Sequence, residues 1–172
     1  MAGPSTLGAR VSDEREIERQ VLAAVEATGE PFEIIEIDPA LADTADFCEH
    51  YGYPLEASAN CILVASKDDP PTVAACLALA TTKLDVNKRV RKLLGVRKLS
   101  FASAELTRQV TGMEIGGVTP FALPADLPLW IDARIAELDR VIVGGGSRAL
   151  KLSVPPTALT GVGGEVVEDL AV

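Results

Sequence analysis

The sequence predicts an α+β domain with a mixed, mostly antiparallel sheet. Two pairs of apolar runs carry this prediction. Residues 61–65 and 72–80 are separated by a polar turn, and residues 140–143 and 149–154 by a glycine-rich turn, so each pair is expected to form a β-hairpin. Helical patterns lie before and between the hairpins, which places the chain in the α+β class.

The elements before the first hairpin follow from local signals. Ser12 is expected to cap a helix whose apolar stripe recurs every fourth residue from Ile17 to Val25, and Gly29 lies just beyond its end. Residues 33–37 are typical of a strand. Asp43-Thr44 then predicts the start of a helix that runs to about residue 49.

The second half of the chain continues with short elements. Asp85 is expected to open a basic helix that ends at Gly95, and residues 98–101 to form a strand. Ser103 predicts the cap of another short helix. Residues 130–138 suit a short helix or a strand with a turn, and Trp130 is expected in the core. Residues 161–172 are weakly patterned.

Length and composition predict one domain over residues 12–172, preceded by a flexible tail over residues 1–11. No apolar run approaches the roughly 18 residues of a membrane span, and the N-terminus lacks a hydrophobic signal region. We therefore expect a cytoplasmic protein without a membrane partner.

Cysteine and histidine usage excludes several chemistries. The three cysteines are widely spaced without a Cys-x-x-Cys pair, so neither a disulfide framework nor a zinc site is indicated. The one histidine, His50, has no supporting triad motif and suits a surface position at a helix end. We expect neither a metal nor a cofactor.

Charge is distributed unevenly along the chain. The net charge of −9 argues against DNA or other nucleic acid as a partner of the surface as a whole. However, residues 83–98, which we call the basic segment, hold seven of the sixteen basic residues against a single acid, Asp85. The segment is either a solvated helix face or a local phosphate site.

Two glycine-rich stretches are the strongest motifs. In residues 111–121, glycine permits positive φ and close backbone approach, while Pro120 fixes φ, so the stretch is either a tight turn or a stiff loop with N–H groups directed at a ligand. Residues Gly144-Gly145-Gly146 suit a hairpin turn, or alternatively a loop that cradles phosphate. Walker and Rossmann spacings are both absent.

An ordered set of motifs resembles the YbaK / prolyl-tRNA synthetase-associated editing domain family. The set comprises the apolar strand 61–65, Leu84-Asp85-x-x-Lys88, Thr111-Gly112 followed by Gly116-Gly117-Val118-Thr119-Pro120, Ile131-Asp132 and the hairpin from Val141 to Gly146. The resemblance spans roughly residues 30–160 and implies a mixed, barrel-like sheet surrounded by helices. It also implies hydrolysis of the ester of mischarged aminoacyl-tRNA, with an aminoacyl-tRNA synthetase as a further partner.

The resemblance assigns roles residue by residue. It implies that the loop from Gly116 to Pro120, with Gly117 and Thr119, holds the aminoacyl ester without a catalytic triad. Lys88 matches a family lysine, which would turn the basic helix with Arg91 and Lys92 toward tRNA phosphates. The glycines 144–146 would border the substrate.

One position departs from the family pattern. The family carries a lysine at the start of its central strand, where this sequence has Asn60. An asparagine offers neutral donors and an acceptor but no charge. Two functions therefore stand: a trans-editing aminoacyl-tRNA deacylase, or a non-catalytic tRNA or small-ligand binding module that has lost the lysine. Cys61 is expected to be an inert buried thiol rather than a replacement nucleophile.

Overall fold

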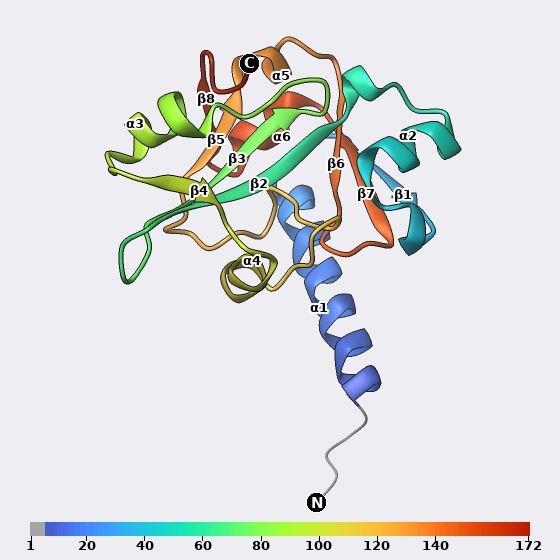
Figure 1. Ribbon diagram of the computed structural model, residues 1–172. Helices are drawn as coiled ribbons and strands as arrows, with labels where there is room; N and C mark the ends of the chain where they lie inside the picture. The colour runs from blue at the N-terminus through green and yellow to red at the C-terminus, as the bar shows by residue number, and fades with distance from the viewer. Residues whose placement is uncertain (1–5) are drawn as a thin grey trace, which may run out of the picture.

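The computed structural model describes the backbone of residues 6–172 and the side chains of residues 14–172 (Figure 1). Helix α1 spans Thr6–Ala27, so it begins six residues before the Ser12 cap that the sequence predicts. Residues 6–11 contain no proline, and a serine is tolerated inside a helix, so nothing in the chain forces a start at Ser12. Residues 1–5 of the predicted tail lie outside the described residues.

A five-stranded sheet forms the larger layer. Its strand order is β4 (Leu99–Phe101), β2 (Ala59–Ser66), β3 (Val73–Leu79), β5 (Leu129–Asp132) and β8 (Glu165–Val167). The predicted hairpin of β2 and β3 is confirmed, and β4 pairs antiparallel with β2. Strands β3, β5 and β8 pair in parallel, which makes the sheet mixed as expected. Strand β8 was not predicted.

A smaller sheet contains β1 (Glu33–Glu36), β7 (Leu150–Val154) and β6 (Val141–Gly144), all antiparallel, and confirms the second hairpin. The two sheets meet at a single β-bridge between Ser58 and Ile142. The expected barrel-like closure is therefore wrong in detail. One bridge does not join two sheets into a continuous ladder, and β4 and β8 remain edge strands.

Apolar side chains from both sheets and from α1 form the main core. Val21 and Val25 of α1 are fully buried with Leu77 of β3 and Leu152 of β7, which explains the predicted stripe of α1. A second cluster on the other face of the larger sheet contains Trp130, so its predicted core position is confirmed. Because β3 is covered on both faces, its sequence reads as a continuous apolar run.

Among the described residues, five further short α-helices surround the two sheets. They are α2 (Thr44–Tyr51), α3 (Arg91–Leu94, preceded by a π-helical turn over Val86–Val90), α4 (Ala104–Thr111), α5 (Ala133–Ala136) and α6 (Pro156–Gly161). Asp85 accepts from the Lys88 N–H and Ser103 from the Leu106 N–H, as the predicted caps require. Gly95 ends α3 in the left-handed region. Within the described part of the chain, no helix combines the length and apolarity of a membrane span.

Candidate functional site

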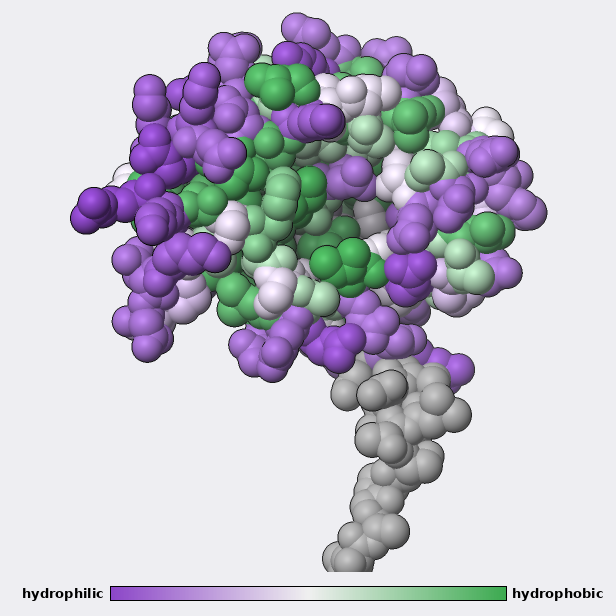
Figure 2. Space-filling model, in the orientation of Figure 1, coloured by the Kyte–Doolittle hydropathy of each residue, from purple (hydrophilic) through white to green (hydrophobic). Residues whose placement is uncertain are grey.

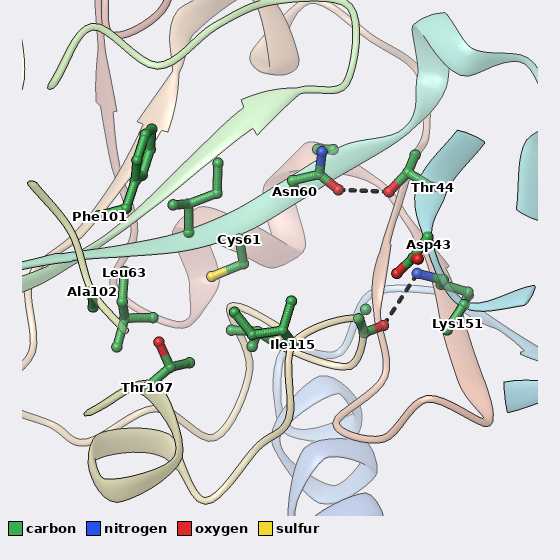
Figure 3. Close-up of a pocket in the computed structure, with 16 residues that line it drawn as sticks. Asp43, Thr44, Asn60, Cys61, Leu63, Phe101, Ala102, Thr107, Ile115 and Lys151 are labelled. Carbon is green, nitrogen blue, oxygen red and sulfur yellow. Dashed lines mark hydrogen bonds between the residues drawn. The ribbon is translucent and has the colours of Figure 1, made fainter. Parts of the chain in front are cut away.

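A pocket of about 420 Å³ opens between β2, the start of α2, the loop before Gly117 and the β6–β7 hairpin. Figure 2 shows it as a hollow in this face of the molecule, with apolar surface extending toward β2 and β4. Its lining divides into two halves (Figure 3). Leu63, Ala102 and Ile115 lie on one side, while Asp43, Thr44, Asn60 and Lys151 lie on the other.

The glycine loop forms one wall of this pocket. Gly116 lines it with φ of +97°, a conformation that glycine adopts at low cost. The Gly117 N–H donates to Glu114 O at 2.9 Å, so this N–H closes a turn and is not free for a ligand. The N–H groups of Gly116 and Val118 donate to no acceptor among the described residues, and they are the loop's candidate donors. The turn and ligand-loop interpretations are thus compatible.

The β6–β7 hairpin holds this loop in place. Arg148 donates to Ile115 O at 2.9 Å and also contacts Asp43 at 3.4 Å, and the Gly146 N–H donates to Gly117 O at 2.8 Å. Gly144 lines the pocket, and a Cβ atom there would collide with Val118 O. Glycines in this hairpin therefore allow its backbone to lie directly against the loop.

Asn60 lies on β2 and faces the polar half of the pocket (Figure 3). The Thr44 hydroxyl donates to its Oδ1 at 2.6 Å, which links the start of α2 to β2. Its Nδ2 group makes no hydrogen bond within the described part of the chain. The side chain therefore offers free N–H donors to a ligand.

Lys151 supplies a cation to the same half of the pocket from β7. The residue is only 6% exposed, and its Nζ donates to Gly116 O at 3.4 Å and lies 5.6 Å from the Phe47 ring centroid. Burial lowers the pKa of the Lys151 ammonium, and the Arg148 charge lowers it further, whereas Asp43 acts in the opposite direction. One long hydrogen bond leaves this buried group with spare donors at the pocket.

Cys61 lines the pocket but is poorly suited to nucleophilic attack. Burial raises the pKa of its thiol far above neutral, and the neighbouring Cys76 thiol raises it further. The thiolate, which is the reactive form, is therefore scarce at neutral pH. This agrees with the expectation of an inert cysteine, although the residue is only partly buried where it lines the pocket.

Other predicted residues lie around the pocket rather than in it. Gly117, Thr119 and Pro120 are buried and do not line the pocket, and Gly145 and Gly146 lie in the hairpin turn. The basic residues Lys88, Arg91 and Lys92 belong to the segment beside β4 and do not line the pocket. Their contact with tRNA remains a prediction.

His50 is exposed near the end of α2, as expected for a surface histidine. Over residues 14–172, no group of three or more His, Cys, Asp or Glu side chains is arranged to hold a metal ion.

The fold and this pocket define a class of protein. A family model described as the aminoacyl-tRNA editing domain matches residues 38–161. The chain therefore belongs to the aminoacyl-tRNA editing domain family, the YbaK-type family that its motifs resemble.

Individual relatives agree with this assignment. The uncharacterized protein YwhH of Bacillus subtilis is 27% identical over 128 residues, which cover 74% of this chain and 79% of that protein. A crystal structure of a candidate trans-editing enzyme for prolyl tRNA synthetase has a TM-score of 0.74 at 22% identity and covers 88% of this chain and 94% of its own. The hypothetical protein APE2540 has a TM-score of 0.78 at 24% identity, with 89% and 99% covered. These two structures support the fold.

Sequence reasoning missed Arg148 and Lys151. Both residues follow the three glycines 144–146 in the sequence. Because side chains alternate between the two faces of a strand, Lys151 could have been assigned to the face of β7 opposite to Leu150 and Leu152. A lysine between Leu150 and Leu152 could have indicated a functional position, because lysine is rarely buried in a strand unless its charge is paired or used.

Proposed function

We propose that the protein is a trans-editing deacylase that hydrolyses the ester of mischarged aminoacyl-tRNA. The observation that carries the proposal is the meeting of the Gly116 loop, Asn60 and the buried Lys151 in one pocket. Family membership supports a tRNA-linked aminoacyl group as the substrate. The activity belongs in the cytoplasm with its tRNA substrate, and an aminoacyl-tRNA synthetase is the expected partner.

The reaction needs few protein groups. Water adds to the ester carbonyl, the bond from the carbonyl carbon to the ribose oxygen breaks, and that oxygen leaves with a proton to give tRNA and a free amino acid. Negative charge develops on the carbonyl oxygen during attack. Preorganised donors that face this oxygen in a partly dry pocket lower the barrier. No triad is required.

We assign the donors from the polar half of the pocket. The Lys151 ammonium and the Asn60 Nδ2 group are the side-chain donors, and the Gly116 and Val118 N–H groups are the backbone candidates. In this assignment the positive charge of the pocket comes from Lys151 on β7, whereas the family pattern has a lysine at the position of Asn60. Arg148 positions the loop through Ile115 O and does not touch the ester.

A second candidate is a non-catalytic tRNA or small-ligand binding module. Asn60 in place of the family lysine favours it, as does the use of Asn60 Oδ1 in a structural contact with Thr44. A panel of tRNAs, each charged with a wrong labelled amino acid, separates the two. The deacylase releases label from at least one member, and Gly116→Val abolishes that release. A folded protein that binds tRNA and releases no label from any member would favour the binding module.

A further inference from the structure

An aromatic side chain stands at the mouth of the pocket. Phe101 ends β4, lines the pocket and is 60% exposed, whereas Phe47 and Phe121 are 1% and 0% exposed. Ile115, which lines the same pocket, is 55% exposed. Exposed apolar surface at a pocket rim commonly marks a binding surface.

Strand β4 connects this aromatic rim to the basic segment. Arg97 and Lys98 directly precede β4 and are exposed, and Phe101 follows three residues after Lys98, about 10 Å along an extended strand. The helical part of the basic segment packs beside β4. The exposed basic residues therefore begin directly before β4, and Figure 1 shows α3 beyond this edge of the larger sheet.

The opposite rim carries exposed acidic residues, of which Asp43 is paired with Arg148. Asp43 stands at the start of α2 with its side chain 66% exposed, and Asp46 and Glu49 of the same helix are also exposed. Asp46 and Glu49 would repel a phosphate chain that leaves the pocket on this side, whereas the basic residues before β4 would attract it. The charge pattern thus gives the polynucleotide one favourable direction.

We propose that Phe101 is the stacking platform for the terminal base of tRNA, and that the acceptor strand runs from there over β4 onto the basic segment. The inference rests on the proposed function, because an ester held near Lys151 requires the attached nucleotide to lie at the pocket mouth. Aromatic side chains stack on any base, since every base presents a π-face. Phe101 therefore binds the terminal nucleotide while the pocket binds the attached amino acid.

The test measures binding of an RNA hairpin without an attached amino acid. The hairpin carries a tRNA acceptor stem with its single-stranded 3′ end. Phe101→Ala is expected to weaken binding about 5- to 150-fold, the range for losing one base–aromatic stack, while Phe101→Trp keeps wild-type affinity. Ile34→Ala is the matched control, because Ile34 is 48% exposed on β1 and does not line the pocket. Unchanged melting temperatures exclude unfolding as the cause.

A second arm tests the direction of the strand. Lys98→Gln is expected to lower the slope of log affinity against log salt by about one, as the loss of one phosphate contact does. Arg19→Gln on α1 should leave this slope unchanged. Wild-type affinity in Phe101→Ala would overturn the proposal. A loss of affinity seen only when a synthetase is added would also overturn it, because the rim would then bind a protein partner. Because the RNA carries no amino acid, these results do not depend on whether the protein hydrolyses esters.

Discussion

Replacing Lys151 with methionine tests the assigned source of charge in the pocket. Methionine preserves most of the length of the side chain and removes the ammonium. If Lys151 faces the developing oxyanion, its loss should lower kcat about 10²–10³-fold, or about 2.7–4 kcal/mol, the cost of deleting one preorganised donor. Substrate binding through the rest of tRNA should change far less, so the effect is expected in kcat and not in KM.

The same substitution should not destabilise the fold. Lys151 is 6% exposed and makes one hydrogen bond of 3.4 Å, so its contacts compensate poorly for burying a charge. Replacing a buried charge by an apolar side chain of similar size is often neutral or stabilising. We expect the melting temperature of Lys151→Met to equal or exceed that of the wild type.

The pH dependence of stability follows from the lowered pKa of Lys151. Between its folded pKa and the ordinary lysine value of 10.5, the unfolded chain binds more protons than the folded one. Wild-type stability should therefore rise with pH across this window relative to Lys151→Met. Denaturant titrations of both proteins at a series of pH values measure the difference.

The activity assay is single-turnover release of label from a mischarged tRNA at saturating protein. Lys67→Met, at an exposed lysine in the β2–β3 turn, is the matched control for losing one positive charge. A Lys151→Met protein that keeps wild-type kcat would refute the assigned role. A variant that loses both activity and stability would instead make Lys151 structural.

Further substitutions test the rest of the site. Gly116→Val should abolish release of label while circular dichroism stays native, because φ of +97° and the Arg148 guanidinium both exclude a branched side chain; normal activity would remove the loop from the mechanism. Arg148→Met should lower kcat at least about tenfold by loosening the loop, and an unchanged rate would show that the loop holds itself. Asn60→Lys alone should lower the melting temperature, because two ammonium groups would share one pocket, and should recover activity when combined with Lys151→Met. Neither effect is expected if Asn60 is an ordinary strand-start residue. Cys61→Ser should retain activity within a few-fold, since burial keeps this thiol protonated, and a complete loss would revive it as a nucleophile.

Local signals in the sequence predicted most of the fold. Turn chemistry and apolar runs identified both hairpins, and the Ser103 and Asp85 caps identified the starts of two helical segments. These features depend on residues close together in the chain. The parallel pairing of β5 with β3 and β8 depends on long-range contacts, and the three residues of β8 carry too little pattern to reveal them.

The candidate site was harder to predict for the same reason. The loop at Gly116 and the strand start at Asn60 were identified through the family pattern, which fixes positions in the chain. Lys151 comes from a different strand, and only the folding of the β6–β7 hairpin against the loop brings it to the pocket. The family pattern places its lysine only at the position of Asn60, so it could not predict a pocket lysine on β7.

Turnover by a small amount of protein tests the central claim most directly. A mischarged tRNA in large excess over the protein is followed until spontaneous hydrolysis becomes significant, and released amino acid is counted per protein molecule. For at least one amino acid, the deacylase account predicts many molecules released per protein, with Lys151→Met near the spontaneous rate. Release at the spontaneous rate from every mischarged tRNA, or protection of the bound ester in proportion to added protein, would contradict it.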